Sequence, residues 1–147
     1  MRGAASGATL MEAVIATALA AIALAISYPA LARGLEGIRL RTAAEQAGEL
    51  LISAQLYADR QREAVLLQID PPSGQVLATS KSSRWERNLS FREPIRITVP
   101  AVNRNILLHP GDLLPDLEIS LAARGTASAG FRADPLQGAV TYWKASE

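Results

Sequence analysis

The chain has 147 residues, of which 49% are hydrophobic, and a net charge of +1. It has room for one modest domain and one membrane element. The absence of cysteine excludes a disulfide framework and thiolate metal sites, and the single histidine, His109, excludes a clustered-histidine metal site. The near-neutral charge gives no indication of a nucleic-acid partner.

The first predicted element is an uncharged apolar run. Ala13 to Ala32 are 20 residues without a charge, rich in Ala, Leu and Ile. As a helix this run would be about 30 Å long, enough to cross the hydrocarbon core of a bilayer. Glu12 stands at its N-terminal edge, after the polar segment Met1–Gly7. An ionised acid within a membrane costs about 2.5–3.5 kcal/mol, and such residues usually have a function and a partner.

Three simpler interpretations compete for this run. It could be a secretory signal peptide, with Arg2 as the basic end and Ala30–Ala32 as the small-residue cleavage site. It could also be a plain membrane anchor or the buried core helix of a soluble domain. None of the three explains the carboxylate of Glu12. The arginines that follow the run favour a cytoplasmic location for the rest of the chain under the positive-inside rule.

The helical period continues beyond the run. Apolar residues recur at steps of four and three and form one stripe, which predicts that this half of the helix docks on other elements. The stripe consists of Leu40, Ala44, Ala47, Leu51, Ala54 and Ala58, widened by Ala43, Leu50 and Tyr57. No proline lies between Pro29 and Pro71, so one long helix from about Ala8 to about Arg62 is expected.

After this helix the pattern changes to strands and turns. Ala64–Ile69 and Gln75–Thr79 are predicted strands joined by the turn Asp70–Gly74. Alternation around Ile97 and around Ile119 predicts two half-buried strands. His109–Asp112 is a predicted loop, and Gly125–Gly130 a flexible turn. Two further strands are predicted at Phe131–Ala133 and Ala139–Trp143. The fold class is therefore α+β, with a long helix packed on a small antiparallel sheet.

The residues for catalysis or metal binding are sparse. A catalytic triad would have to combine His109 with Asp112 or Asp116 and a serine, and a lone histidine beside Pro-Gly is more often a loop residue. Nucleotide and zinc-peptidase motifs are absent. Asp112, Asp116 and Glu118 could bind calcium only weakly, and solvation of these acids is the favoured interpretation. We therefore expect no enzyme activity, no catalytic residue, no metal and no cofactor.

The segment Gly7-Ala8-Thr9-Leu10-Met11-Glu12 resembles the processing site of type IV pilins and type II secretion pseudopilins. In that family a polar leader ends in Gly, and the fifth residue of the mature chain is Glu. The resemblance implies cleavage after Gly7, N-methylation of Ala8, an assembly ion pair at Glu12 and a helix kink at Pro29. Ala8 stands where the family usually has Phe.

Within this pilin-like family the chain resembles the GspH/FimT-type minor pseudopilins. The resemblance implies a leader at 1–7, a membrane-spanning helix at 8–32, a periplasmic half of that helix at 33–62 and a periplasmic antiparallel β domain at 63–147. It also implies a single-pass protein of the bacterial inner membrane that serves a type II secretion system. Its implied partners are other major and minor pseudopilins, the prepilin peptidase/methylase and the inner-membrane assembly platform.

One alternative from the same family is a FimT-like minor pilin that binds DNA for uptake. The residues that could contact the DNA backbone would be the basic ones: Lys81, Arg84, Arg87, Arg92, Arg96, Arg104, Arg124, Arg132 and Lys144. Trp85 and Trp143 would be its stacking surfaces. Against it, basic and acidic residues nearly balance, and the chain ends Lys144–Glu147 without an arginine-rich tail. A nucleic-acid partner is therefore not expected.

Overall fold

The computed structural model describes residues 5–123 and 127–145, with side chains from Thr9 onward except that of Arg33. The chain divides into two parts, Met1–Leu35 and Glu36–Glu147. Helix α1 (Ala5–Gln61) begins in the first part and ends in the second. The predicted long helix is therefore confirmed, with bounds close to the expected ones.

The C-terminus of α1 is closed by backbone geometry. Arg62 has a φ of 54°, in the left-handed region. The N–H of Glu63 then donates to the carbonyl of Ala58 at 3.2 Å. This six-to-one bond after a left-handed residue is the Schellman ending of a helix, and it satisfies one of the free terminal carbonyls.

In the first part the described residues are helical throughout. Alanine and leucine are the residues that favour a helix most. The helix continues through Pro29, so the proline does not end it. Proline has no N–H to donate to the carbonyl four residues earlier, and for this reason a kink is expected at Pro29. That kink stays a prediction.

The second part contains two antiparallel four-stranded sheets, where the sequence predicted one small sheet. The first sheet has the order β3-β2-β1-β5, with β1 (Val65–Asp70), β2 (Gln75–Ser80), β3 (Glu86–Ser90) and β5 (Asn105–Leu108). The second has the order β4-β6-β7-β8, with β4 (Arg96–Thr98), β6 (Leu117–Ala122), β7 (Ser128–Asp134) and β8 (Ala139–Ala145). A short 3-10 helix, Ala101–Asn103, lies between β4 and β5.

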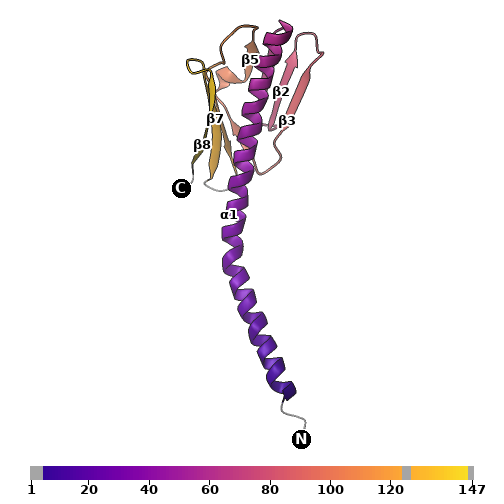
Figure 1. Ribbon diagram of the computed structural model, residues 1–147, viewed down its shortest axis with the longest axis vertical. Coiled ribbons are helices and arrows are strands. Elements are labelled where there is room, and N and C mark those ends of the chain that lie inside the picture. Colours follow the sequence, from indigo (N-terminus) through magenta and orange to yellow (C-terminus); the bar gives the residue numbers. More distant parts are fainter. Residues whose placement is uncertain (1–4, 124–126, 146–147) are drawn as a thin grey trace. The chain divides into compact units, whose positions relative to one another are not determined.

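The core lies between the second half of α1 and the inner faces of both sheets. The predicted stripe from Leu40 to Ala58 is buried, apart from the half-buried Tyr57 at its margin, which confirms the docking face of the helix. The sheets contribute alternate residues, such as Leu67 of β1 and Ile119 of β6. Figure 1 shows this half of α1 running past β2 and β3 on one side and β7 and β8 on the other.

Two strands were missed by sequence reasoning. β3 has the sequence ERNLS and is largely exposed, and β5 has only four residues. Both lie at the edges of their sheet, where one face and one side of the strand meet solvent. The alternation of apolar and polar residues that marks a half-buried strand is therefore weak in them.

The predicted flexible turn Gly125–Gly130 is wrong in its second half. Gly125 and Thr126 lie outside the described residues, whereas Ser128–Gly130 belong to β7. A Cβ at Gly130 would lie 2.3 Å from the carbonyl oxygen of Ile119 and 2.6 Å from the ring of Trp143. This glycine permits close packing inside a strand, a role that a Gly-rich pattern does not distinguish from a turn.

Candidate functional site

The outstanding feature of the first part is an apolar helical surface. Its large apolar side chains are exposed, for example Leu24 at 69% and Ile26 at 73%. The helix is long and apolar enough to cross a membrane, and the described residues of its most apolar window are not buried within the chain. Fully exposed apolar surface of this extent is unfavourable in water, so it needs lipid or another apolar partner.

Polar groups within this surface are few, and one is satisfied locally. The hydroxyl of Thr17 donates to the carbonyls of Ala13 and Val14, at 3.0 and 2.9 Å. A hydroxyl bonded to its own helix presents no free donor to hydrocarbon. Thr17 is therefore compatible with a lipid-facing helix.

The predicted site residues lie on this helix. Gly7, Ala8, Glu12 and Pro29 are all within α1. Ala8 and Glu12 are four residues apart, so they share one face of the helix, one turn from each other. A chain that began at Ala8 would have its terminal amine close to the turn that carries the Glu12 carboxylate.

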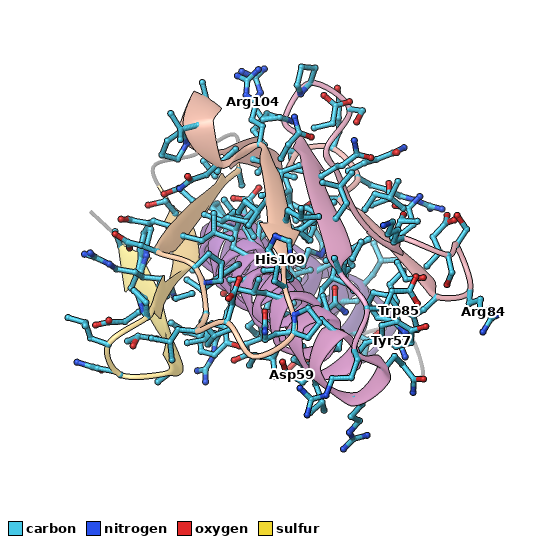
Figure 2. All side chains as sticks on the ribbon, turned by 90° about the horizontal axis from the view of Figure 1, so that it is seen from above. Tyr57, Asp59, Arg84, Trp85, Arg104 and His109 are labelled. Atoms are coloured by element: carbon cyan, nitrogen blue, oxygen red, sulfur yellow. The ribbon has the colours of Figure 1, made fainter. Side chains whose placement is uncertain are left out.

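The basic residues proposed for the DNA-binding alternative are dispersed. Arg87 lies on β3, Arg96 on β4 and Arg132 on β7, where it pairs with Asp116 at 3.6 Å. Figure 2 shows Arg84 and Arg104 at well-separated margins of the same view. Arg124 lies outside the described residues. Arg87, Arg96 and Arg132 thus lie on three different strands of two sheets.

The two tryptophans have packing roles. The ring of Trp85 stacks on that of Tyr57 with centroids 5.0 Å apart and planes 18° from parallel, as Figure 2 shows. Trp143 is half-buried over Gly130, and its indole nitrogen is buried. Each ring is therefore engaged in packing within the fold, and a stacking role on DNA stays a hypothesis of the alternative.

The loop around His109 is held by the end of α1, and sequence reasoning missed this contact. Nε2 of Gln55 donates to the carbonyls of His109 and Asp112, both at 3.1 Å. Oδ1 of Asp59 accepts from the N–H of Gly111 at 2.7 Å. Figure 2 shows Asp59 and His109 at this end of the helix. Gln55 sits among the apolar stripe residues, and a polar residue in such a stripe is the signal that could have revealed it.

The remaining candidates are not brought together. His109 is exposed, and its main-chain carbonyl accepts from the N–H of Asp112 at 3.2 Å. Within residues 5–123 and 127–145, no three His, Cys, Asp or Glu side chains lie together as a metal-ion site. The main-chain carbonyl of Asp116 accepts from Asn103, and Glu118 is exposed on β6.

No family model, no curated protein and no solved structure matches this chain.

Tyr142 on β8 packs against helix α1. Its ring lies over Gly48, where an added Cβ would be 2.5 Å from the phenol oxygen. Burial raises the pKa of the Tyr142 hydroxyl, and the carboxylates of Glu49 and Glu45 raise it further. The absence of a side chain at Gly48 thus brings the end of β8 against the helix.

Proposed function

We propose that this chain is a minor pseudopilin, a structural subunit of a type II secretion pseudopilus, that assembles through its N-terminal helix. The observation that carries the proposal is the contrast within α1. Its first half has an exposed apolar surface with Glu12 near its N-terminal end, and its second half is docked on antiparallel sheets. A subunit of this kind is held in the bacterial inner membrane by the first half, with the sheets in the periplasm.

The proposed mechanism is mechanical. Cleavage after Gly7 frees the amine of Ala8, which keeps its positive charge on methylation. At about 4 Å and an effective dielectric constant of about 20, attraction between this amine and the Glu12 carboxylate is about 4 kcal/mol. That is comparable to the cost of placing the acid in the membrane. The pairing within one subunit or with a neighbour's amine would favour the correct axial register in the filament.

The helical backbone from Gly7 to Glu12 supports this role for Glu12. Because Ala8 and Glu12 share a helix face, the freed amine of one subunit can approach its own carboxylate without breaking the helix. In the filament the same face can be offered to the next subunit. The exposed apolar side chains then move from lipid into contact with other helices, which exchanges one apolar environment for another.

Processing is the first test. Mass spectrometry of the membrane-bound protein should show a chain that starts at Ala8, and Gly7→Val should block this cut. A chain that starts at Arg33 would show instead that the apolar run is a secretory signal peptide. An unprocessed chain in the native host would remove the pilin-like interpretation and leave a plain membrane anchor.

The Glu12 series tests assembly separately. Glu12→Gln keeps the size and hydrogen bonding of the side chain but removes its charge, so it should insert and be cleaved normally. Co-purification with the other filament subunits should be lost, and Glu12→Asp should retain part of it. Normal co-purification of Glu12→Gln would show that the ion pair has no role. Assembly should be measured directly, because a subunit of low copy number can be held in place by its neighbours.

A further inference from the structure

The outer edge of β5 carries main-chain groups that no described strand pairs with. β5 is the last strand of the first sheet, and its inner side is bonded to β1. The N–H of Ile69 donates to the carbonyl of Arg104 at 2.7 Å, which fixes the alternation of this antiparallel ladder. Asn105 and Leu107 therefore direct their N–H and C=O groups away from β1. No backbone bond joins either residue to another described segment.

The strands at the edges of the two sheets differ in charge. Edge strands commonly carry charged residues, which discourage pairing with a further chain. Such residues are present in β3 (Glu86 and Arg87), in β4 (Arg96) and in β8 (Lys144). β5 has the sequence NILL and carries no charge. It is therefore the edge on which the fold places no charged residue against an added strand.

Exposed leucines accompany this edge. Leu107 is 52% exposed and lies opposite Leu66 of β1, and Leu113 in the following segment is 68% exposed. An open hollow of about 500 Å³ beside the edge is lined by both exposed leucines together with Leu108 and Pro115. Successive residues of a strand point to opposite faces, so a strand added here would bury these leucines with alternate side chains.

The hollow also has an uncompensated acid. Asp112 lines it, is exposed, and forms no ion pair with a described Lys or Arg. Asp59, likewise exposed and without such a pair, accepts from the N–H of Gly111 in the same loop. Arg104 precedes the opposite end of β5 from His109, as Figure 2 shows. A basic residue at the His109 end of an added strand would offset the acidic charge.

We propose that the outer edge of β5 docks an extended segment of a partner protein as a fifth strand of the first sheet. The unpaired main-chain groups of Asn105 and Leu107 fit an extended backbone, and the exposed leucines fit apolar side chains at alternate positions. Asp112 favours a Lys or Arg at the end of the segment that lies beside Leu108.

The surroundings of the hollow favour a single strand over the edge of a second copy of this chain. Residues of β5 and of the segment Gly111–Pro115 line the same hollow. One extended chain fits there, whereas a second folded sheet would bring its next strand against that segment. The inference goes beyond the pseudopilin proposal and does not rest on it, because its residues all lie in Glu36–Glu147.

The test is binding of a fluorescent peptide to the full chain in detergent, measured by anisotropy and corrected with empty micelles. The probe is a lysine followed by alternating valine and threonine, so antiparallel pairing puts the lysine beside Leu108. The control peptide has proline in place of each threonine and lacks those N–H donors. We expect a Kd below about 1 mM for the probe and about tenfold weaker binding of the control.

Hydrogen exchange tests the ladder itself. Binding of the probe should slow exchange of the amides of Asn105 and Leu107 about tenfold, because these groups become hydrogen-bonded. The absence of binding, equal binding of the proline control, or binding without this protection would overturn the proposal. Self-association of the chain that the probe reverses would also overturn it, because the edge would then belong to a second copy.

Variants locate the peptide. Leu107→Lys should weaken binding of the probe about tenfold, because it removes apolar contact and adds a like charge. Leu136→Lys is the matched control, since Leu136 is 93% exposed in the turn before β8, and it should bind like the original chain. Both variants should keep the original Tm. If the two variants bind the probe equally well, the peptide does not lie on β5.

The charge match has its own test. Asp112→Asn should weaken binding of the lysine probe about twofold to fivefold at low salt. A probe with glutamine in place of the lysine should bind the variant and the original chain equally. An equal effect of Asp112→Asn on both probes would overturn the placement of a basic residue beside Leu108.

Discussion

The two parts of the chain use similar apolar residues in opposite ways. Leu24 in the first part is 69% exposed and Leu51 in the second is 1% exposed, although both belong to α1. In the second part the apolar residues alternate with charges at helical spacing, and the sheets cover them. In the first part there is no charge from Ala13 to Ala32. The comparison shows that the arrangement of polar residues, more than apolar content, decides whether a helix packs within its own chain.

The largest expected effect sharpens this comparison with one substitution at two sites. Leu51→Ala should lower the free energy of unfolding of the second part by about 2–5 kcal/mol, because it leaves a cavity in a packed core. Leu24→Ala should leave that free energy unchanged. Chemical denaturation of the detergent-solubilised chain, followed by circular dichroism, measures both. If both variants lost the same free energy of unfolding, the two halves of α1 would be buried to the same extent.

The reverse substitution tests the first part. Leu19→Arg places a charge in the uncharged run and should raise the cost of membrane insertion by about 3–4 kcal/mol. Membrane fractionation should then show less protein in the membrane, while any chain that is recovered keeps the unfolding transition of its sheets. The matched control is Leu19→Ile. If Leu19→Arg partitions like the control, the run does not enter lipid.

Substitutions at two glycines compare a tightly packed position in a strand with an open position on the helix. Gly130→Ala should destabilise the second part by about 1–3 kcal/mol, because the new Cβ meets a carbonyl of β6 and the Trp143 ring. Gly34→Ala meets nothing within 4 Å and should favour the helix by up to about 1 kcal/mol. Thermal unfolding with helicity as the readout measures both. Destabilisation by Gly34→Ala would show that an apolar partner already covers that position.

The smallest effect is the pH dependence from Tyr142. Its hydroxyl has a pKa above the ordinary value of 10.0, since burial and the nearby carboxylates disfavour the phenolate. Between pH 10 and the raised value the unfolded chain loses this proton and the folded chain keeps it. Stability from this group is therefore complete below pH 10 and falls as pH rises. Tyr142→Phe should reduce the loss of stability above pH 10, measured as the free energy of unfolding against pH. If the profiles of the variant and the original chain run parallel, Tyr142 makes no contribution to the pH dependence.

Sequence reasoning predicted the parts of the fold that depend on local periodicity. The stripe from Leu40 to Ala58 predicted a docked helix because helical geometry places residues three and four apart on one face. The strands around Ile97 and Ile119 were found because alternate residues of a half-buried strand meet opposite environments. The edge strands β3 and β5 were missed, since solvent on several sides imposes little pattern.

For the candidate site, the sequence by itself determined the apolar run, its acidic edge at Glu12 and the spacing between Gly7 and Glu12. These features depend only on which residues follow one another. Only the tertiary structure decided that there are two sheets, that Trp85 and Trp143 are engaged in packing, and that Gln55 meets the loop of His109. Gln55 and His109 are 54 positions apart. No local pattern encodes such a meeting, because it arises when separate elements close on one core.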